Sequence, residues 1–324
     1  MIMTNKPTLS VMFTDFYGSP KKPVEWNPFY KLLSKYYALE VSSSPDFLIY
    51  SNFGCEYLKY DCIRIFITGE NVRPNYQECD YAFSFDFPFT ERNYRLPLYR
   101  LYKGYDLLLQ PRNPEAVMTQ YRKFCSFLVS NEAPDQRIKL FELLSEYKKV
   151  DSGGKFRNNI GAPVPRGQEI AWLSNYKFNI TYENSSYPGY TTEKLLHSLA
   201  ANAIPIYWGN PLVGDDFNTR AFINCHEYNS LEDVVERIKE IDSNDNLYRE
   251  MLDQPFLPGG VEVETNKEER IVEKFASIFA SNKVYIPSFQ KRIQRTKYPF
   301  LKSRKWFINR LKPTIKKLVV GNPN

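Results

Sequence analysis

The sequence of 324 residues has few side chains that bind metals. It contains two histidines, His197 and His226, and no Asp-x-Asp pair. Its five cysteines are odd in number, and none has the close spacing of a metal site. Structural zinc sites use four Cys or His ligands, so this inventory predicts no metal site. The cysteines are expected to be free thiols in a reducing compartment.

A long apolar run is also missing. No stretch approaches the ~20 apolar residues that a membrane-spanning helix needs. The N-terminal segment, MIMTNKPTLSVMFTDF, has no basic residues followed by an apolar stretch, so we expect no signal peptide. Two glycosylation sequons, at Asn179 and Asn184, lie inside the most informative segment of the chain, which argues against a glycosylated secretory protein. These features predict a cytoplasmic protein.

The charge is unevenly distributed. The net charge is +6, but residues 285–324 hold eleven Lys and Arg residues and no acidic residue. The rest of the chain has 32 basic and 37 acidic residues and is mildly acidic. The sequence therefore predicts an acidic globular body with a basic C-terminal tail.

Short apolar runs alternate with helical patterns, which is typical of open α/β sheets. The length fits two domains, and we place their boundary near residue 120. We expect strands at 9–15, 47–50, 63–67, 81–85, 124–129 and 221–224, and helices at 28–37, 114–122, 133–147, 231–241, 246–253 and 266–280.

Residues 176–209 read YKFNITYENSSYPGYTTEKLLHSLAANAIPIYWG. The pattern predicts a strand, a polar loop, a helix that begins near Thr191 or Thr192, and a second strand from Ala203 to Trp208. Free N–H groups at a helix start favour an anion. Lys194 adds a positive charge there, and the Glu193 carboxylate is suited to a pair of sugar hydroxyls. The segment therefore suits a nucleoside diphosphate, although Glu193 and Lys194 could also be ordinary surface charges.

The order of Tyr-Lys-Phe, Glu-Asn-Ser, Tyr-x-Thr-Glu-Lys and Ile-Pro-Ile-Tyr-Trp-Gly in this segment resembles the signature of the bacterial α-1,3-fucosyltransferases. The resemblance covers most of residues 60–285, without the Leu-rich heptad repeats of some bacterial members. It implies a GT-B fold, in which two Rossmann-like domains face each other across a cleft. It also implies GDP-fucose as donor substrate. We expect an acceptor domain at 1–120, a GDP-fucose-binding domain at 121–284 and the tail at 285–324.

The resemblance extends to the first domain, where Ile-Thr-Gly-Glu-Asn follows a predicted strand and Arg95-x-Pro-Leu-Tyr comes later. The Glu of Thr-Gly-Glu is the proposed base in that family, and this implies the role for Glu70. A carboxylate at the end of a strand is placed to take a proton from an acceptor hydroxyl. A solvated loop charge is the alternative reading of Glu70.

Further donor-site residues follow from the same resemblance. Arg137, in a Ser-Asn … Arg helix start, matches the diphosphate-binding arginine of the family, and Arg157 in a Gly-Gly … Arg-Asn element is assigned a supporting role near the nucleotide. Asn184, Tyr190, Glu193 and Lys194 are expected to contact the ribose, phosphates or fucose. Arg137 and Lys194 would neutralise the departing GDP in place of a metal ion, so we expect no obligate cofactor.

The implied reaction transfers fucose, with inversion, to O3 of N-acetylglucosamine in an acceptor such as N-acetyllactosamine. Acceptor contacts are expected from loops such as 16–26 and 86–95, whose sequences do not predict type 1 against type 2 chain preference. Two alternatives stay open, a GT-B transferase with another donor or acceptor and a degenerate transferase that only binds glycans or membranes.

The basic tail has apolar residues at helical spacing, among them Phe300, Phe307 and Leu311, with Lys and Arg between them. Such segments lie on anionic membrane surfaces, so we expect residues 290–320 to dock the protein peripherally on the inner face of the membrane. Pro313 would interrupt a helix there. A solvated tail and nucleic-acid contact are the alternatives, and we expect no nucleic-acid partner.

Overall fold

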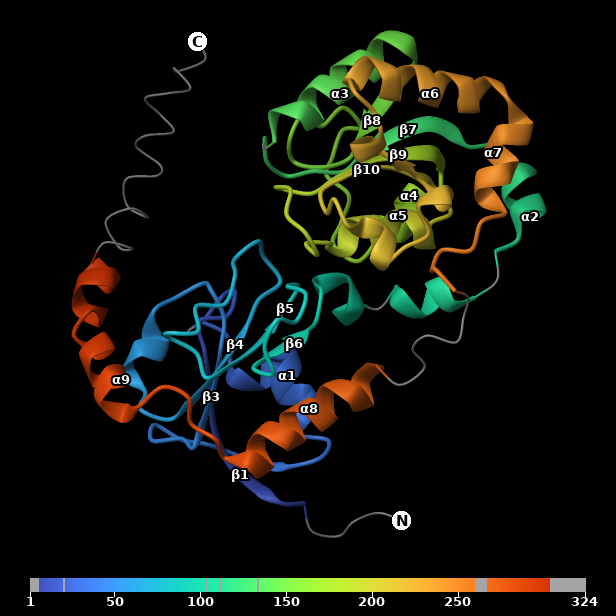
Figure 1. The fold of residues 1–324 in the computed structure, drawn as a ribbon. Coiled ribbons are helices and arrows are strands. Elements are labelled where there is room, and N and C mark those ends of the chain that lie inside the picture. The colour runs from blue at the N-terminus through green and yellow to red at the C-terminus, as the bar shows by residue number, and fades with distance from the viewer. Residues whose placement is uncertain are drawn as a thin grey trace.

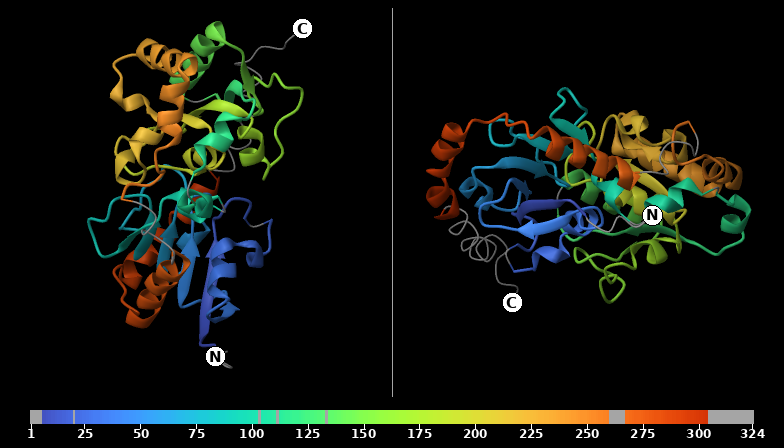
Figure 2. Two further views of the ribbon diagram at one scale, coloured as in Figure 1. Left: turned by 90° about the vertical axis from the view of Figure 1, so that its right-hand side faces the viewer. Right: turned by 90° about the horizontal axis from the view of Figure 1, so that it is seen from below.

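Two parallel β-sheets organise the computed structural model, which describes residues 6–19, 21–102, 104–110, 112–132, 134–259 and 267–303. Residues 304–324, which make up much of the predicted membrane-docking tail, lie outside the described residues. Each sheet is the centre of one lobe, and the two lobes are stacked on each other (Figure 1 and Figure 2). The predicted α/β class with two Rossmann-like domains is confirmed.

The first sheet has six strands in the order β2-β1-β3-β4-β5-β6. Its central strands are buried along their whole length and are mostly apolar, as is usual for parallel sheets covered on both faces, although they include the buried Arg64 and Ser84. The strands are β1 (Thr8–Thr14), β2 (Ala38–Val41), β3 (Phe47–Tyr50), β4 (Ile63–Ile67), β5 (Tyr81–Ser84) and β6 (Asn93–Arg95), with helix α1 (Pro28–Leu33) between β1 and β2. Strands β2 and β6 were not predicted, and α1 ends four residues earlier than expected.

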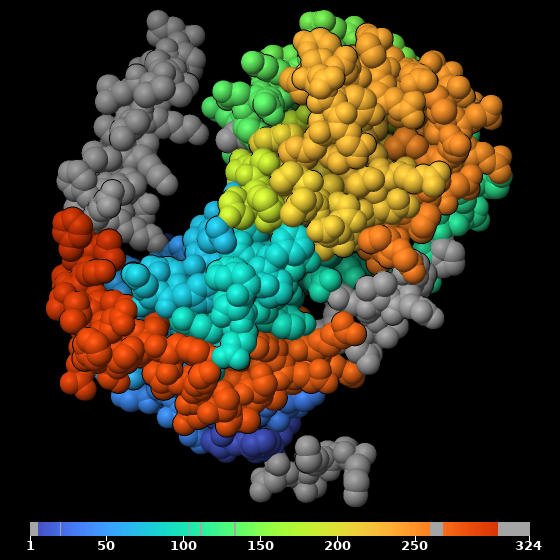
Figure 3. Space-filling view, in the orientation of Figure 1, coloured from blue at the N-terminus to red at the C-terminus, as the bar shows by residue number. Residues whose placement is uncertain are grey.

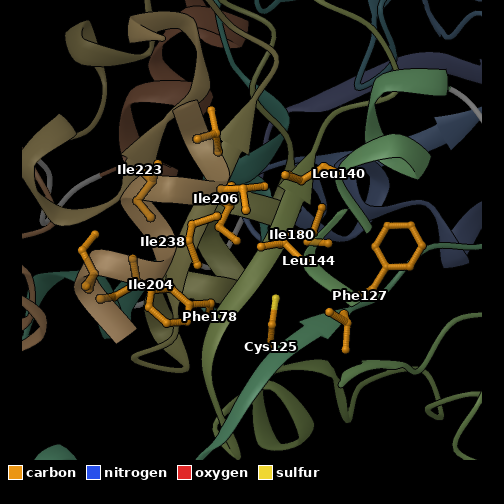
Figure 4. Close-up of a cluster of buried hydrophobic side chains, with 14 of the residues drawn as sticks. Cys125, Phe127, Leu140, Leu144, Phe178, Ile180, Ile204, Ile206, Ile223 and Ile238 are labelled. Atoms are coloured by element: carbon orange, nitrogen blue, oxygen red, sulfur yellow. The ribbon is translucent and has the colours of Figure 1, made fainter. Parts of the chain in front are cut away.

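The second sheet has five strands in the order β11-β10-β9-β7-β8. Helices α3 and α6 cover one face, and α4 and α5 cover the other (Figure 1). Figure 4 shows the core beneath α3 and α6, where strand residues such as Phe178 and Ile206 meet Leu140 and Ile238. The elements are β7 (Lys123–Phe127), α3 (Asp135–Tyr147), β8 (Val150–Ser152), α4 (Glu169–Leu173), β9 (Tyr176–Tyr182), α5 (Glu193–Ala200), β10 (Ile204–Trp208), β11 (Ile223–Asn224), α6 (Leu231–Ser243) and α7 (Asp245–Leu252).

The chain crosses between the lobes twice, and both crossings differ from the expected boundaries. The short helical segments η3 (Leu98–Leu101) and η4 (Tyr105–Leu109) pack Tyr99 and Leu108 against α5, and α2 (Pro114–Met118) packs against α7. Residues 98–118 therefore belong to the second core and not to a domain that ends at 120. The ring of Tyr99 is buried in this second core, and the sequence around Tyr99 does not predict which of the two cores it joins.

Helix α8 (Lys267–Ser281) returns to the first lobe (Figure 1). Its apolar face, Ile271, Phe275 and Ile278, is buried in the core of the first sheet, where the ring of Phe275 stacks on that of Phe83 with centroids 4.3 Å apart. This corrects the assignment of residues up to 284 to the second domain. The helical pattern predicted α8, but an amphipathic helix does not specify which sheet covers its apolar face.

The first part of the basic tail is also held on the first lobe. In α9 (Ser288–Arg295), Lys291 is 2% exposed and forms an ion pair of 2.9 Å with the fully buried carboxylate of Asp80. The same carboxylate accepts hydrogen bonds from the backbone N–H groups of Tyr285, Ile286 and Arg64. Lys291 therefore does not contribute to a free basic tail. Among the described helices, none is long and apolar enough to cross a membrane.

Candidate active site

The predicted strand–loop–helix–strand unit is present in the second domain. β9 and β10 are parallel neighbours, with Ile180 beside Ile206 in register. Helix α5 begins at Glu193, and Thr192 is its N-cap, with a hydroxyl that accepts from the backbone N–H of Lys194. The polar loop between β9 and α5 therefore lies at the carboxyl edge of the sheet, where α/β folds bind their ligands.

Glu183 organises this edge of the sheet. Its side chain is fully buried, and its two carboxylate oxygens accept from the N–H and the hydroxyl of Thr192, both at 2.7 Å. The Nζ of Lys194 donates to the same carboxylate at 3.0 Å. A buried carboxylate is stable only when such donors surround it. Glu183 thus fixes both the start of α5 and the position of Lys194.

The side chain of Glu183 fits because Gly209 follows β10. A Cβ atom at residue 209 would lie 2.5 Å from Cγ of Glu183, closer than real contacts allow. The glycine of the Ile-Pro-Ile-Tyr-Trp-Gly segment therefore makes room for the carboxylate. The sequence contained both residues, but only the structure shows that they are in contact.

Lys194 lies among carboxylates. Burial alone would lower the pKa of Lys194, but the negative charges of Glu183 and Glu193 outweigh it and raise the pKa above the usual value of lysine. The Nζ is 3.8 Å from Glu193, and about a fifth of the Lys194 side chain is exposed. Lys194 is therefore a permanent positive charge at the mouth of the site, where an anion could replace Glu193 as its partner.

A cavity of about 550 Å³ opens beside Lys194 in the second domain. Its volume is in the range of about 300 to 1,000 Å³ typical of small-molecule sites. Its wall combines the β7 loop, the glycine turn after β8 and the start of α5, and includes Arg137, Gly154, Asn184, Glu193 and Lys194. Four of the six predicted donor-site residues are thus brought together on one surface.

Arg137 lies in the first turn of α3 and is buried with 1% exposure. Its guanidinium donates to the carbonyl of Tyr182 at 3.2 Å and to the side chain of Asn131 at 2.6 Å. Burial lowers the pKa of Arg137 to about 10, partly offset by the charge of Glu183. The arginine is thus held rigidly in the cavity wall, as a preorganised positive charge.

Two predicted donor contacts are placed differently. Tyr190 is 2% exposed and is not in the wall of either cavity near the site. Its ring meets Phe85 of the first domain edge-on, with centroids 5.3 Å apart. Tyr190 therefore packs between the domains. Its expected contact with the donor stays a prediction.

Arg157 also turns away from the cavity. It pairs with Glu142 on α3 at 2.6 Å, and its guanidinium lies over the rings of Phe141 and Phe156. Its own backbone has a positive φ of 48°. Lys155, two residues earlier, lines the cavity instead. The local Gly-Gly … Arg-Asn pattern did not distinguish these two basic residues.

Glu70 lies three residues after Ile67, the last residue of β4 in the first domain, and its backbone N–H donates to the hydroxyl of Thr68. Glu70 is exposed at the surface, but neighbouring protein atoms exclude part of the water around its carboxylate. This partial burial raises the pKa of Glu70 above the usual value. The charges of Glu193 and Glu183 raise it further, and that of Lys194 lowers it. Glu70 therefore lies within electrostatic reach of the α5 start, although the two are far apart in the sequence.

Direct contacts fix the two domains around this place. The Nδ2 of Asn71, next to Glu70, donates to the hydroxyl of Ser185 in the polar loop at 2.7 Å. Arg95 forms a two-pronged ion pair with Asp216 at 2.7 and 2.6 Å. Figure 3 shows the corresponding surfaces, cyan in the first domain and yellow-green to yellow in the second, in contact. The two domains face each other as predicted, and they are in direct contact beside Glu70.

A second cavity of about 970 Å³ lies at the carboxyl edge of the first sheet. Glu70 is in its wall, together with loops that follow β1 and β3. Tyr102 and Arg166 line both cavities, so the two spaces meet at these residues. Sequence reasoning missed both, because Arg166 belongs to an irregular loop and Tyr102 to the chain crossing. The arrangement can hold one ligand in each domain and bring their ends together near Glu70.

Among the described residues, no group of three or more His, Cys, Asp or Glu side chains is arranged to hold a metal ion. All five cysteines are free thiols. His197 lines the 550 Å³ cavity beside Tyr102, and burial lowers its pKa, so it is a neutral residue of the cavity wall.

Comparison with known proteins identifies the two halves separately. Residues 11–102 match the model of the α-(1,3)-fucosyltransferase FucT N-terminal domain, and residues 118–254 match the C-terminal model of glycosyltransferase family 10 (fucosyltransferase). The chain is 31% identical to the α-(1,3)-fucosyltransferase FucT of Helicobacter pylori over 78% of its own length and 61% of that protein.

Other relatives match over shorter regions. A fucosyltransferase of Acanthamoeba polyphaga mimivirus, described as putative in its name, is 36% identical over 41% of the chain and 24% of that protein. Human 3-galactosyl-N-acetylglucosaminide 4-alpha-L-fucosyltransferase is 31% identical over 43% of the chain and 38% of that protein. The chain thus spans less than two thirds of the length of these curated relatives.

The fold agrees with solved structures over nearly the whole chain. A crystal structure of an α1,3-fucosyltransferase superimposes with a TM-score of 0.75 and 27% identity, over 89% of this chain and 94% of that one. A structure of an α1,3-fucosyltransferase with GDP-fucose gives a TM-score of 0.73 at 27% identity, over 88% of this chain and 94% of that one. The expected GT-B architecture is therefore confirmed. From its two domain models, its relatives and its fold, the chain belongs to the α-1,3-fucosyltransferase family, glycosyltransferase family 10.

Proposed function

We propose that the protein transfers L-fucose from GDP-fucose to O3 of N-acetylglucosamine in an acceptor such as N-acetyllactosamine, with inversion at the transferred carbon. One observation carries this proposal. Glu70, from the first domain, lies within electrostatic reach of Glu193 and Lys194, from the second, where the two cavities meet. A base facing a diphosphate-binding helix start is what this reaction requires.

The donor nucleotide occupies the 550 Å³ cavity in this proposal. The positive end of the α5 dipole, together with Lys194, binds the diphosphate. Glu193, which is a quarter exposed, accepts from the ribose hydroxyls. Asn184 is exposed on the same wall and contacts the phosphates or the fucose. Arg137 adds a fixed positive charge from the wall of the cavity.

The chemical step then follows from these positions. Glu70 takes the proton of the acceptor hydroxyl, and the hydroxyl oxygen bonds to the anomeric carbon of fucose. The bond between that carbon and the phosphate oxygen breaks, and its electron pair leaves with GDP. Arg137 and Lys194 stabilise the charge that grows on the diphosphate. Attack opposite the leaving group converts the β-linked donor into an α-linked product.

The two cations are proposed to replace a divalent metal at the diphosphate, so that the enzyme needs no obligate cofactor. The test is a reaction of the full-length protein with GDP-fucose and N-acetyllactosamine in EDTA. We expect GDP release together with an α-1,3-fucosylated product. GDP release without that product would reduce the activity to donor hydrolysis or to another acceptor. Absence of both GDP release and GDP binding would overturn the proposal in favour of a binding protein.

We also propose that the protein docks peripherally on the cytoplasmic, anionic face of a membrane. The outward face of α9 and the following residues exposes Phe289, Ile293 and Phe300, each by 59% or more. Arg292, Arg295 and Lys297 are exposed beside them. An apolar stripe between basic residues suits the surface of anionic lipids.

The docking proposal is tested by sedimentation with phosphatidylglycerol and phosphatidylcholine vesicles. We expect binding to the anionic vesicles and its loss when Phe289, Ile293 and Phe300 are replaced by serine. Phe89→Ser, at a site 68% exposed on the first domain, is the matched control. Equal sedimentation of the triple variant and the control would exclude this face as the membrane contact.

A further inference from the structure

Two polar side chains lie where the two cavities meet, and the proposed reaction uses neither of them. Tyr102 and Arg166 line both the 550 Å³ cavity and the 970 Å³ cavity. In the described part of the chain, the Tyr102 hydroxyl and the Arg166 guanidinium form no hydrogen bond and no ion pair. Both groups are therefore available to a ligand that extends from one cavity into the other.

The chain crossing holds Tyr102 between the two domains. Segment η3 ends directly before Tyr102 and packs on the turn that carries Glu70, where a Cβ atom at Gly69 would lie only 2.6 Å from Cδ1 of Leu98. On its other side, the ring of Tyr102 meets the ring of His197 on α5 edge-on, with centroids 5.6 Å apart. Tyr102 is thus fixed between the Glu70 turn and the helix of the donor site.

Arg166 reaches the same place from a different element. It is exposed and lies three residues before α4, in the loop that follows the glycine turn after β8. Helix α4 packs closely on the chain crossing, because a Cβ atom at Gly104 would lie 3.0 Å from Cδ1 of Ile170. Tyr102 and Arg166 therefore come from segments that are in contact, although they are far apart in the sequence.

The two side chains offer different hydrogen bonds. Burial and the charge of Glu193 raise the pKa of Tyr102 to about 12, although the charge of Arg166 lowers it, so the hydroxyl keeps its proton at neutral pH. A tyrosine hydroxyl can both donate and accept, which suits a sugar hydroxyl. A guanidinium only donates, and its planar fork matches the oxygens of a phosphate. Tyr102 therefore suits a sugar, and Arg166 suits a phosphate.

The position of the two side chains indicates which part of a ligand they meet. In the proposed function, the diphosphate lies beside Lys194 in the 550 Å³ cavity and the acceptor hydroxyl lies beside Glu70 in the 970 Å³ cavity. The reacting atoms of two substrates must come within about 3.5 Å of each other. The sugar that is transferred must therefore lie where the cavities meet, with the phosphate to which it is bonded on the donor side.

We propose that Tyr102 and Arg166 bind the donor on either side of the bond that breaks. The hydroxyl of Tyr102 forms a hydrogen bond with a hydroxyl of the transferred sugar, and the guanidinium of Arg166 pairs with the phosphate bonded to that sugar. Arg166 is then a third cation for the departing diphosphate, in addition to Arg137 and Lys194. This inference rests on the proposed function, because it takes GDP-fucose as the donor.

The test measures the Kd of GDP-fucose, GDP and GMP by titration calorimetry without acceptor, for the full-length wild type, Tyr102→Phe and Arg166→Gln. Tyr102→Phe keeps the ring that packs on His197, so it is expected to weaken GDP-fucose binding about three- to tenfold and to leave GDP binding unchanged. Arg166→Gln is expected to weaken the binding of GDP-fucose and GDP about 10- to 100-fold. It should leave the binding of GMP, which lacks the second phosphate, unchanged.

Each variant has a matched control. Arg157→Gln changes an arginine of the same loop that pairs with Glu142 and turns away from the cavity. Tyr121→Phe changes a ring that is 92% exposed and lines neither cavity. Both controls are expected to bind the three nucleotides as the wild type does.

GDP-fucose affinity within about twofold of the wild type in both Tyr102→Phe and Arg166→Gln would overturn the inference. An equal loss of GDP binding in Tyr102→Phe would also overturn it, because the hydroxyl would then not contact the sugar. If both variants lose GDP-fucose binding as expected but the wild type transfers no fucose to N-acetyllactosamine, the proposed function fails and the two donor contacts stand.

Discussion

Replacing Glu183 by glutamine tests whether one buried carboxylate holds the donor site together. The change keeps the size of the side chain but removes the charge that pairs with Lys194 and accepts from Thr192. Lys194 would keep Glu193 as a partner at 3.8 Å, but not the close buried one. Removing one member of a buried ion pair costs about 3–5 kcal/mol.

The magnitude follows for a domain of this size. About 2–4 °C of melting temperature is lost per kcal/mol in domains of about 150–250 residues, so Glu183→Gln should lower the melting temperature by roughly 6 to 20 °C. The KM for GDP-fucose should rise, because the pKa of Lys194 is raised by Glu183 and falls towards its burial-lowered value without it. Glu193→Gln, at a side chain a quarter exposed, should raise the KM without a comparable loss of stability.

The assay is a thermal melt of both variants with and without GDP, followed by KM measurements. In the wild type, a raised lysine pKa contributes stability that is fully present below the unfolded value, about 10.4, and is lost only as pH rises through the higher folded value. The contribution of Lys194 is therefore constant between about pH 6 and 9. A Glu183→Gln protein that melts within about 2 °C of wild type and keeps its KM would refute the reasoning.

Three further outcomes are expected. Gly209→Ala should lower the free energy of unfolding by about 1–3 kcal/mol in a denaturation curve, because the new Cβ meets Glu183. Gly214→Ala, where the nearest contact of a new Cβ is at 3.5 Å, should leave the stability unchanged. Equal denaturation curves for the two variants would contradict the packing argument. The kcat/KM of the wild type should fall as the pH drops through the pKa of Glu70, which lies above 4.5. Glu193→Gln should lower the midpoint of this pH profile, because the charge of Glu193 raises the pKa of Glu70. An unchanged midpoint would show that Glu70 and Glu193 do not interact. Lys291→Met should lower the free energy of unfolding by about 3–5 kcal/mol, because it leaves Asp80 buried without its cation. Arg292→Met, at a side chain 73% exposed, should keep the melting temperature within about 2 °C of the wild type. Similar melting temperatures of the two variants would refute the anchoring of α9.

The sheet strands and the donor-site helix could be predicted because their signals are local. A run such as Phe47–Tyr50 is apolar and buried throughout, and Thr192 caps the helix that carries Glu193 and Lys194. The resemblance added Glu70 and Arg137, which the structure places in the walls of the two adjoining cavities. Their roles in catalysis and donor binding stay predictions.

Contacts between distant segments could not be predicted. Nothing local distinguishes Tyr190, which packs on Phe85, from an open binding tyrosine, or Arg157 from Lys155 in the same loop. The return of α8 to the first domain and the burial of Lys291 against Asp80 depend on which surfaces are left to cover. The type of a residue indicates which chemistry its side chain can perform, whereas its burial and its contact partners depend on the fold of the whole chain.

The division of labour between the domains is tested most directly by Glu70→Gln, with Glu40→Gln as an exposed control in the same domain. Transfer to N-acetyllactosamine is measured together with the Kd for GDP-fucose. Loss of general-base catalysis predicts a fall in kcat of about 10² to 10⁴ with an unchanged Kd. Transfer within threefold of wild type, at an unchanged Kd, would contradict Glu70 as the base.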